Sequence, residues 1–351
     1  MLGALLHNVL HHVRSMAEKL ATRIVILLLI VISMVVVIKY GMARHLAEYN
    51  ETASAQRALR WDQSCPDALN TLARSQLNKD PKQAENLLRD AIDARPVNAE
   101  SILMLSGLET DPLLASRLIE IAVSFNPSYA NILIAAAKHW AERGEDSRAI
   151  ALWSDALMAN PDTKKQLFPV FSSVAEDPTA RHLLHDVIDN KPPWWEDFFQ
   201  VLARTARATE SVQAVFAELE KNQVYPPTAR ERRAFVKRLL KEGLTKEAYL
   251  VWMEGLSKEE RHHLGLIYNG GFEIEPDNAG FDWIVHSPKS TQAGTTITAF
   301  GATGKKALRV VLRDFKARYQ HIWQRLFLEP GDYQMKGWVR VDSLRTRRGF
   351  H

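Results

Sequence analysis

The sequence predicts a multi-domain chain of three parts: a single membrane-spanning helix, an all-α helical-repeat solenoid and a C-terminal all-β sandwich. Three observations support this fold class. An uninterrupted apolar run occupies residues 24–38, helix-forming residues punctuated by proline fill residues 44–260, and glycine, threonine and alternating apolar residues dominate residues 261–351. Helical periodicity and strand alternation are the main sequence signals for these classes.

The apolar run predicts a membrane-spanning helix. The 15 residues of 24–38 form about 22 Å of helix, which is shorter than the roughly 30 Å hydrocarbon core. Extending the helix to Ala43, with the Lys39 ammonium reaching toward the headgroups, supplies the missing length, so we expect the span at residues 24–43. A cleavable signal peptide is the alternative, because Gly41 and Ala43 are small residues at the spacing that a signal peptidase recognises.

Residues 1–23 form a short lead whose apolar side chains recur every three or four positions, which predicts an amphipathic helix on the membrane surface. The positive-inside rule favours a cytoplasmic lead, by a difference of about one charge, and so places residues 44–351 outside the cytoplasm. The basic residues that flank the apolar run are Arg14, Lys19, Arg23, Lys39 and Arg44.

Composition excludes several classes of protein. The 351 residues carry a net charge of +4 from 45 basic and 41 acidic side chains, and this small excess is spread along the chain, so we expect no nucleic-acid partner. Cys65 is the only cysteine, which excludes an intramolecular disulfide and a cysteine-based zinc site. A single cysteine fits a bacterial periplasm and a cytoplasm equally well.

An internal repeat organises residues 44–260. A spacing of four, three and five residues recurs at intervals of 31 and 34 residues. Two alanines let neighbouring helices approach closely, the larger residue between them fills the groove, and proline ends the helix. The repeated positions are Ala84, Leu88, Ala91, Pro96; Ala115, Ile119, Ala122, Pro127; and Ala149, Trp153, Ala156, Pro161.

On these residues the stretch resembles tetratricopeptide repeats. In the third unit the preceding helix also matches, with Leu133, Ala136, Ala137 and Trp140 at the positions where the family has Trp, Leu, Gly and Tyr. The resemblance implies about five helix pairs and a concave face, lined by the first helix of each pair, that binds a protein or peptide partner. The groove residues that the repeat alignment predicts for the third unit are Asn131, Ile134 and Lys138.

The C-terminal part predicts short strands at residues 266–268, 283–286, 307–312, 320–328 and 333–341. The order of Asn269 to Glu273, Phe281 to Trp283 and Gly304 to Val310 resembles carbohydrate-binding modules of the galactose-binding-like fold. Such jelly rolls usually have eight or more strands. We therefore expect an incomplete sandwich, either because the sequence is a fragment or because another chain completes the module.

Strand alternation predicts one candidate glycan site. Trp323 and Arg325 share a face of one strand, and Trp338 and Arg340 share a face of the next. If these faces adjoin, two indoles form a platform for sugar rings, and the guanidinium groups bind hydroxyls or carboxylates. The alternative is that both tryptophans pack against the rest of the protein.

Other candidate sites are weaker. Glu273 matches a calcium ligand of the resembling modules, but a lone carboxylate is more typical of a surface charge. His182 and His185 lie one turn apart without a third ligand, and residues 299–306 lack the Gly and the Ser or Thr of a phosphate loop. We therefore predict no metal, no cofactor and no catalytic site.

Together the resemblances imply a non-enzymatic protein of the bacterial cell envelope, anchored in the inner membrane with its bulk in the periplasm. It would support polysaccharide synthesis or export, with protein, membrane and polysaccharide as partners. Two alternatives stay open: a glycan-active enzyme whose catalytic residues lie beyond His351, and a purely structural spacer.

Overall fold

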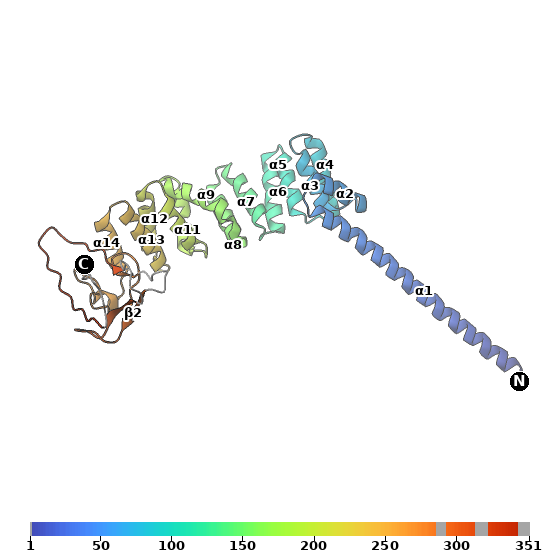
Figure 1. Cartoon of the computed structure of the whole chain (residues 1–351). Helices are drawn as coiled ribbons and strands as arrows, with labels where there is room; N and C mark the ends of the chain where they lie inside the picture. The colour runs from blue at the N-terminus through green and yellow to red at the C-terminus, as the bar shows by residue number, and fades with distance from the viewer. Residues whose placement is uncertain (1, 286–292, 313–321, 343–351) are drawn as a thin grey trace. The chain divides into compact units, whose positions relative to one another are not determined.

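The structure is a computed structural model that describes residues 2–285, 293–312 and 322–342; the side chains of residues 2–22, 293 and 312 are outside this description. The chain divides into two compact units, Met1–Thr163 and Lys164–His351. Helices fill the first unit and most of the second, and the described strands lie near the C-terminus (Figure 1).

The first unit is a series of helix pairs. Neighbouring helices pack in chain order, most extensively α3 on α4, α5 on α6 and α7 on α8. The first unit is therefore a helical repeat. The helices are α1 (Leu2–Ala47), α2 (Thr52–Trp61), α3 (Pro66–Gln76), α4 (Pro81–Ala94), α5 (Ala99–Leu108), α6 (Pro112–Phe125), α7 (Ala130–Ala141) and α8 (Asp146–Ala159).

The repeated alanines have the role that their spacing predicts. Both alanines of each unit are buried on the second helix of a pair, and each of these helices ends two residues before its proline. Two second helices also begin in the same way, with proline in the first turn and an aspartate cap. Asp80 accepts a hydrogen bond from the Gln83 backbone at 3.0 Å, and Asp111 accepts one from Leu113 at 2.9 Å.

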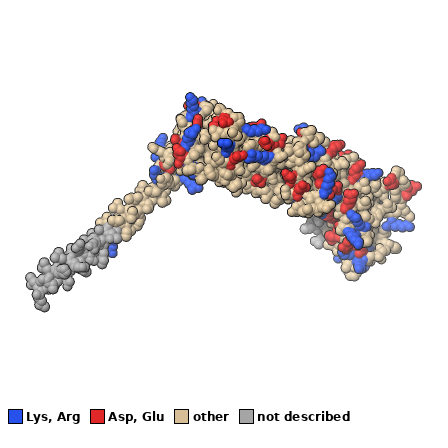
Figure 2. All heavy atoms as spheres, turned by 180° about the vertical axis from the view of Figure 1, so that it is seen from behind, with Lys and Arg blue, Asp and Glu red and all other residues tan. Residues whose placement is uncertain are grey.

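The apolar helix continues without a break into this repeat. Residues 24–38 of α1 are exposed along their whole length, whereas Ala43 and Ala47 are 1% and 3% exposed in a core with Ala55 and Cys65. Figure 2 shows the described apolar part of α1 as an almost uncharged rod beside the mixed charges of the repeat surface. By length and composition, Arg23–Ala47 can cross a membrane, and a signal sequence meets the same criterion.

The second unit begins with helical pairs built around aromatic residues. Phe171, Trp194 and Phe198 pack with ring centroids 4.8–6.1 Å apart. Two of its helices begin at Trp195 and at Ala229, and Gly243, at φ +79°, lies in the turn before the helix that begins at Thr245. The helices are α9 (Lys164–Glu176), α10 (His185–Asn190), α11 (Trp195–Thr205), α12 (Thr209–Lys221), α13 (Ala229–Lys241), α14 (Thr245–Glu254) and α15 (Lys258–Arg261), with short 3-10 helices at Pro161–Thr163 and Arg181–Leu184.

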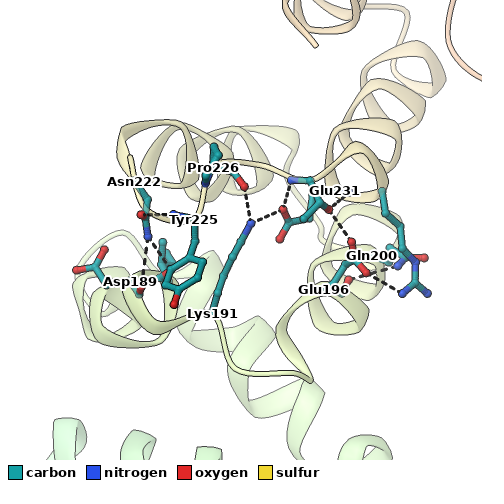
Figure 3. A network of polar contacts seen from close by, with 11 residues as sticks. Asp189, Lys191, Glu196, Gln200, Asn222, Tyr225, Pro226 and Glu231 are labelled. Carbon is teal, nitrogen blue, oxygen red and sulfur yellow. Dashed lines mark hydrogen bonds and ion pairs between the residues drawn. The ribbon is translucent and has the colours of Figure 1, made fainter. Parts of the chain in front are cut away.

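A buried ion pair joins α10 to the start of α13 (Figure 3). The Lys191 Nζ atom donates to the Pro226 carbonyl at 2.9 Å and lies 2.7 Å from Oε2 of Glu231, whose side chain is fully buried. The same oxygen accepts the Thr228 backbone N–H at 2.7 Å, which completes a capping box. Neither charge is solvated by bulk water, so each depends on the other.

We expect Lys191→Met to lower the free energy of unfolding of the second unit by about 3 kcal/mol, because it leaves the Glu231 carboxylate buried without its cation. Hydrogen exchange of the α11 and α13 amides in the full-length chain measures this loss. The matched control is Lys221→Met, which removes an exposed ion pair to Glu218 and should change stability by only about 0.5 kcal/mol. Equal effects of the two substitutions would show that the buried pair has no special structural role.

The predicted sandwich is not formed by the described residues. Strand β1 (Ile284–Val285) pairs antiparallel with β4 (Ile322–Trp323), and β2 (Ala293–Thr298) pairs antiparallel with β3 (Ala307–Leu312) as a separate ladder. The strand predicted at 307–312 is confirmed, and those at 283–286 and 320–328 are confirmed only in part, with residues 286 and 320–321 outside the description. The strands predicted at 266–268 and 333–341 are wrong.

Aromatic packing on α14 explains part of this difference. Trp252 on α14 lies 4.9 Å from Tyr268 and 5.6 Å from Phe281, centroid to centroid. Gly280, at φ +61°, lies so close to the Trp252 indole that a Cβ atom would clash with it. Residues 268–281 are therefore turns that pack against a helix, and burial against α14 replaces strand pairing.

Candidate partner-binding cavity

A cavity of about 540 Å³ opens between the first helices of successive pairs in the first unit. It is lined from the end of α1, from α3 and α5, and from the start of α7. The second residue of each of the last three helices contributes: Asp67 on α3, Glu100 on α5 and Asn131 on α7. The cavity thus extends along the first helices of successive pairs.

The walls of this cavity carry both signs of charge. Arg74 forms an ion pair with Glu100, and Arg95 lies 3.2 Å from Asp67. Arg44, at the end of α1, also lines the cavity and makes no ion pair among the described residues. The exposed Tyr129 ring adds an apolar surface at the start of α7. Such a surface offers hydrogen-bond donors and acceptors side by side.

Buried hydrogen bonds fix the wall between α3 and α5. The Ser101 hydroxyl donates to Asn70 Oδ1 at 2.6 Å, and the Asn70 amide donates to Asn98 Oδ1 at 3.5 Å. Asn98 also caps α5 by accepting the Ser101 backbone N–H at 3.4 Å. All three residues are buried. Because buried polar groups need partners, this network fixes the separation of the two helices.

The three residues predicted for the groove are only partly brought together. Asn131 lines the cavity. Ile134 is half-buried on the next turn of α7, and Lys138 is exposed and lies 3.8 Å from Glu142; neither lines the cavity. Sequence analysis missed Asp67 and Glu100, although both occupy the same position as Asn131 in their helices. An alignment of the first residues of these helices would have identified both.

His139 connects α7 to α6. Its Nε2 atom lies 3.2 Å from Ser116 Oγ, and its Nδ1 atom lies 3.4 Å from a nitrogen of the Arg143 guanidinium. Since Arg143 can only donate, Nδ1 accepts and Nε2–H donates, which is the neutral ring. Burial and the adjacent Arg143 charge lower the pKa of His139. Protonation would place an Nδ1–H donor against the Arg143 guanidinium. The guanidinium also donates to the Pro112 carbonyl of α6 at 3.3 Å, so protonation would weaken this link between the helices.

The depressed pKa of His139 predicts a pH-dependent stability of α6 and α7. Because the unfolded-state pKa of about 6.5 lies above the folded-state pKa, the stabilising contribution is present above about pH 6.5 and is lost as pH falls through the folded-state pKa. We expect His139→Gln to reduce this loss between about pH 7.5 and 5.5. Hydrogen exchange, corrected for intrinsic rates, measures it. The control is His182→Gln at an exposed histidine; a wild-type slope in His139→Gln would contradict the assignment.

The predicted glycan platform is not assembled. The Arg325 guanidinium lies 5.9 Å from the centre of the Trp323 ring, so one half of the proposed site is present. Trp338 is 81% exposed outside any strand, Arg340 is also exposed, and no ring contact joins the two tryptophans in the part of the chain that the structure describes. Residue Phe327, which alternation places beside Trp323, instead stacks on Tyr249 of α14 at 5.3 Å.

Glu273 binds the backbone of Lys305 and Lys306. Its Oε1 atom accepts the backbone N–H groups of Lys305 and Lys306 at 2.9 and 3.2 Å. The carboxylate thus anchors this loop. Within the described ranges, no group of three or more His, Cys, Asp or Glu side chains has a metal-binding arrangement. His182 Nδ1 lies 2.8 Å from the Thr179 carbonyl.

No protein-family model matches this chain, and no curated protein matches it significantly. Solved structures similar to it include a thermophilic TPR protein of Thermus thermophilus, with 17% identity over 57% of this chain and 97% of that chain and a TM-score of 0.30. A tetratricopeptide repeat protein of Parabacteroides merdae has 15% identity over 62% and 95%, with a TM-score of 0.28. These TM-scores are too low to support a fold assignment. The helical repeat is therefore assigned from the helix pairs and the buried alanines of this chain.

Proposed function

We propose that this chain is a membrane-anchored interaction scaffold that binds a segment of a partner protein in the first-helix cavity. The position of that cavity is the main support for this proposal. It is enclosed by the end of α1 and by the first helices of three further pairs, so four successive repeats converge on one site. A site shared by several repeats is what helical-repeat proteins use to bind extended segments.

The cavity walls favour a polar, extended partner segment. Asn131 and the Arg74–Glu100 pair offer donors and acceptors to a peptide backbone, and the Tyr129 ring offers a surface for one apolar side chain. Arg44 makes no ion pair among the described residues and is available to an acidic group of the partner. The fixed α3–α5 wall lowers the loss of conformational entropy on binding.

The packing of α1 supports an uncleaved anchor. Cleavage after Ala43 would cut the helix where Ala43 is buried beside Ala55 and Ala58. We also propose that the span ends near Ile38, since Ala43 contacts protein, and that it begins near residue 20. These 19 residues reach about 28 Å, close to the thickness of the hydrocarbon core. The charges that flank the run favour the non-cytoplasmic side for the repeats, as in a bacterial envelope protein.

A topology reporter tests the anchor and its direction. We expect a periplasm-active reporter fused after residue 260 to be active and the same reporter fused at the N-terminus to be inactive. The mature chain should keep residues 1–43 by intact mass and should resist alkaline extraction from membranes. A chain that starts at Arg44 would establish a signal peptide, and a cytoplasmic reporter after residue 260 would overturn the envelope location.

Photocrosslinking tests partner binding in the cavity. We expect a photoreactive side chain at Asn131 of the full-length chain to give a discrete crosslinked product in its own cells. The same group at Lys138, on α7 but outside the cavity, is the matched control and should give none. Tyr129→Ala should lower the yield about tenfold, which corresponds to the loss of one well-packed aromatic contact. Equal products at both positions would exclude the cavity as the binding site.

A further inference from the structure

A second cavity, of about 660 Å³, lies beside α1 at the end of the apolar run. Lys39 of α1 forms one side of it. Arg60 and Trp61 at the end of α2 form another, and Asp90 and Asp93 near the end of α4 complete it. Three helices therefore contribute two cations, two carboxylates and an indole to the cavity, and Asp62, just after α2, adds a third carboxylate.

The position of this cavity relative to a membrane follows from the helix itself. Lys39 comes directly after Ile38, the last residue of the exposed apolar run, and α1 continues without interruption from one to the other. Charged groups from α2 and α4 share the cavity with Lys39, so hydrocarbon cannot extend past this level. If α1 spans the membrane as proposed, the cavity opens at the level of the lipid headgroups.

Four charged side chains around this cavity make no ion pair among the described residues. They are Lys39, Arg60, Asp90 and Asp93. Asp93 lies in the last turn of α4, where a negative charge is unfavourable to the helix dipole. By contrast, Asp62, which also lines the cavity, is buried and accepts a 2.9 Å hydrogen bond from the Ser64 hydroxyl. The four unpaired charges are therefore available to a ligand.

We propose that this cavity binds the headgroup of a zwitterionic phospholipid that carries a primary ammonium group, as in phosphatidylethanolamine. Lys39 and Arg60 neutralise the phosphate. Asp90 and Asp93 accept hydrogen bonds from the ammonium, which has three N–H donors, and Trp61, whose side chain is 44% exposed, packs at the membrane interface. The cavity is lined by both cations and carboxylates, and the ligand carries one charge of each sign.

Lipid retention in a defined bilayer tests this proposal. The full-length chain is reconstituted in nanodiscs of equal parts phosphatidylethanolamine, phosphatidylcholine and phosphatidylglycerol, and the lipids that stay bound after mild delipidation are identified by native mass spectrometry. We expect phosphatidylethanolamine to be enriched about fivefold over each competitor, which equals a free-energy difference of about 1 kcal/mol. The double substitution Asp90→Asn and Asp93→Asn should remove this enrichment, and Arg60→Gln should lower the retention of all three lipids.

The matched control is the pair Glu145→Gln and Asp146→Asn, which removes two exposed carboxylates at the start of α8, outside the cavity. It should leave the enrichment unchanged, and circular dichroism verifies that each variant folds. Preferential retention of phosphatidylglycerol, equal retention of phosphatidylcholine, or enrichment that survives the Asp90 and Asp93 substitutions would each overturn the proposal. Failure of the chain to enter nanodiscs would instead overturn the membrane span on which the proposal depends.

Discussion

The packing of Ala43 and Ala47 against α2 and α3 is the contact on which the rest of the first unit depends. These methyl groups convert one helix from an exposed apolar rod into the first member of a repeat within about one turn. Small side chains are required there because the helices approach closely, and the same requirement recurs at each later pair. The apolar helix and the first-helix cavity are consequently parts of one continuous folded structure.

Local sequence was sufficient to predict the helical repeat, because its signals are local. Buried Ala at four- and three-residue spacing, proline beyond the helix end and aspartate caps act within a single helix, and they also specify how the next helix packs. The same alignment singles out Asn131, which lines the cavity. It does not single out Asp67 and Glu100, which line the same cavity, because their helices diverge from the first helix of the third unit in their packing residues.

The C-terminal region shows where local patterns fail. Residues 307–312 form a strand as their alternation predicts, and residues 333–341 alternate equally well but form none. Strand formation needs a partner, which alternation does not specify. Around residues 268–281, aromatic contacts with Trp252 decide the conformation. The predicted sugar platform required two strands to lie side by side, and the structure does not pair them. The contact between Trp323 and Arg325 is present because it requires only residues that are close in sequence.

The absence of a flexible joint between Ile38 and Ala43 has a mechanical consequence. A helix that enters the repeat core directly transmits its tilt and its rotation to the first helix pair. If α1 spans the membrane as proposed, its apolar run has no excess length, so a thicker membrane cannot be matched by tilting and instead draws the repeats toward the headgroups. Bilayer thickness would then set the orientation of the first-helix cavity relative to the membrane. A change of lipid composition would change that orientation through the continuous helix α1.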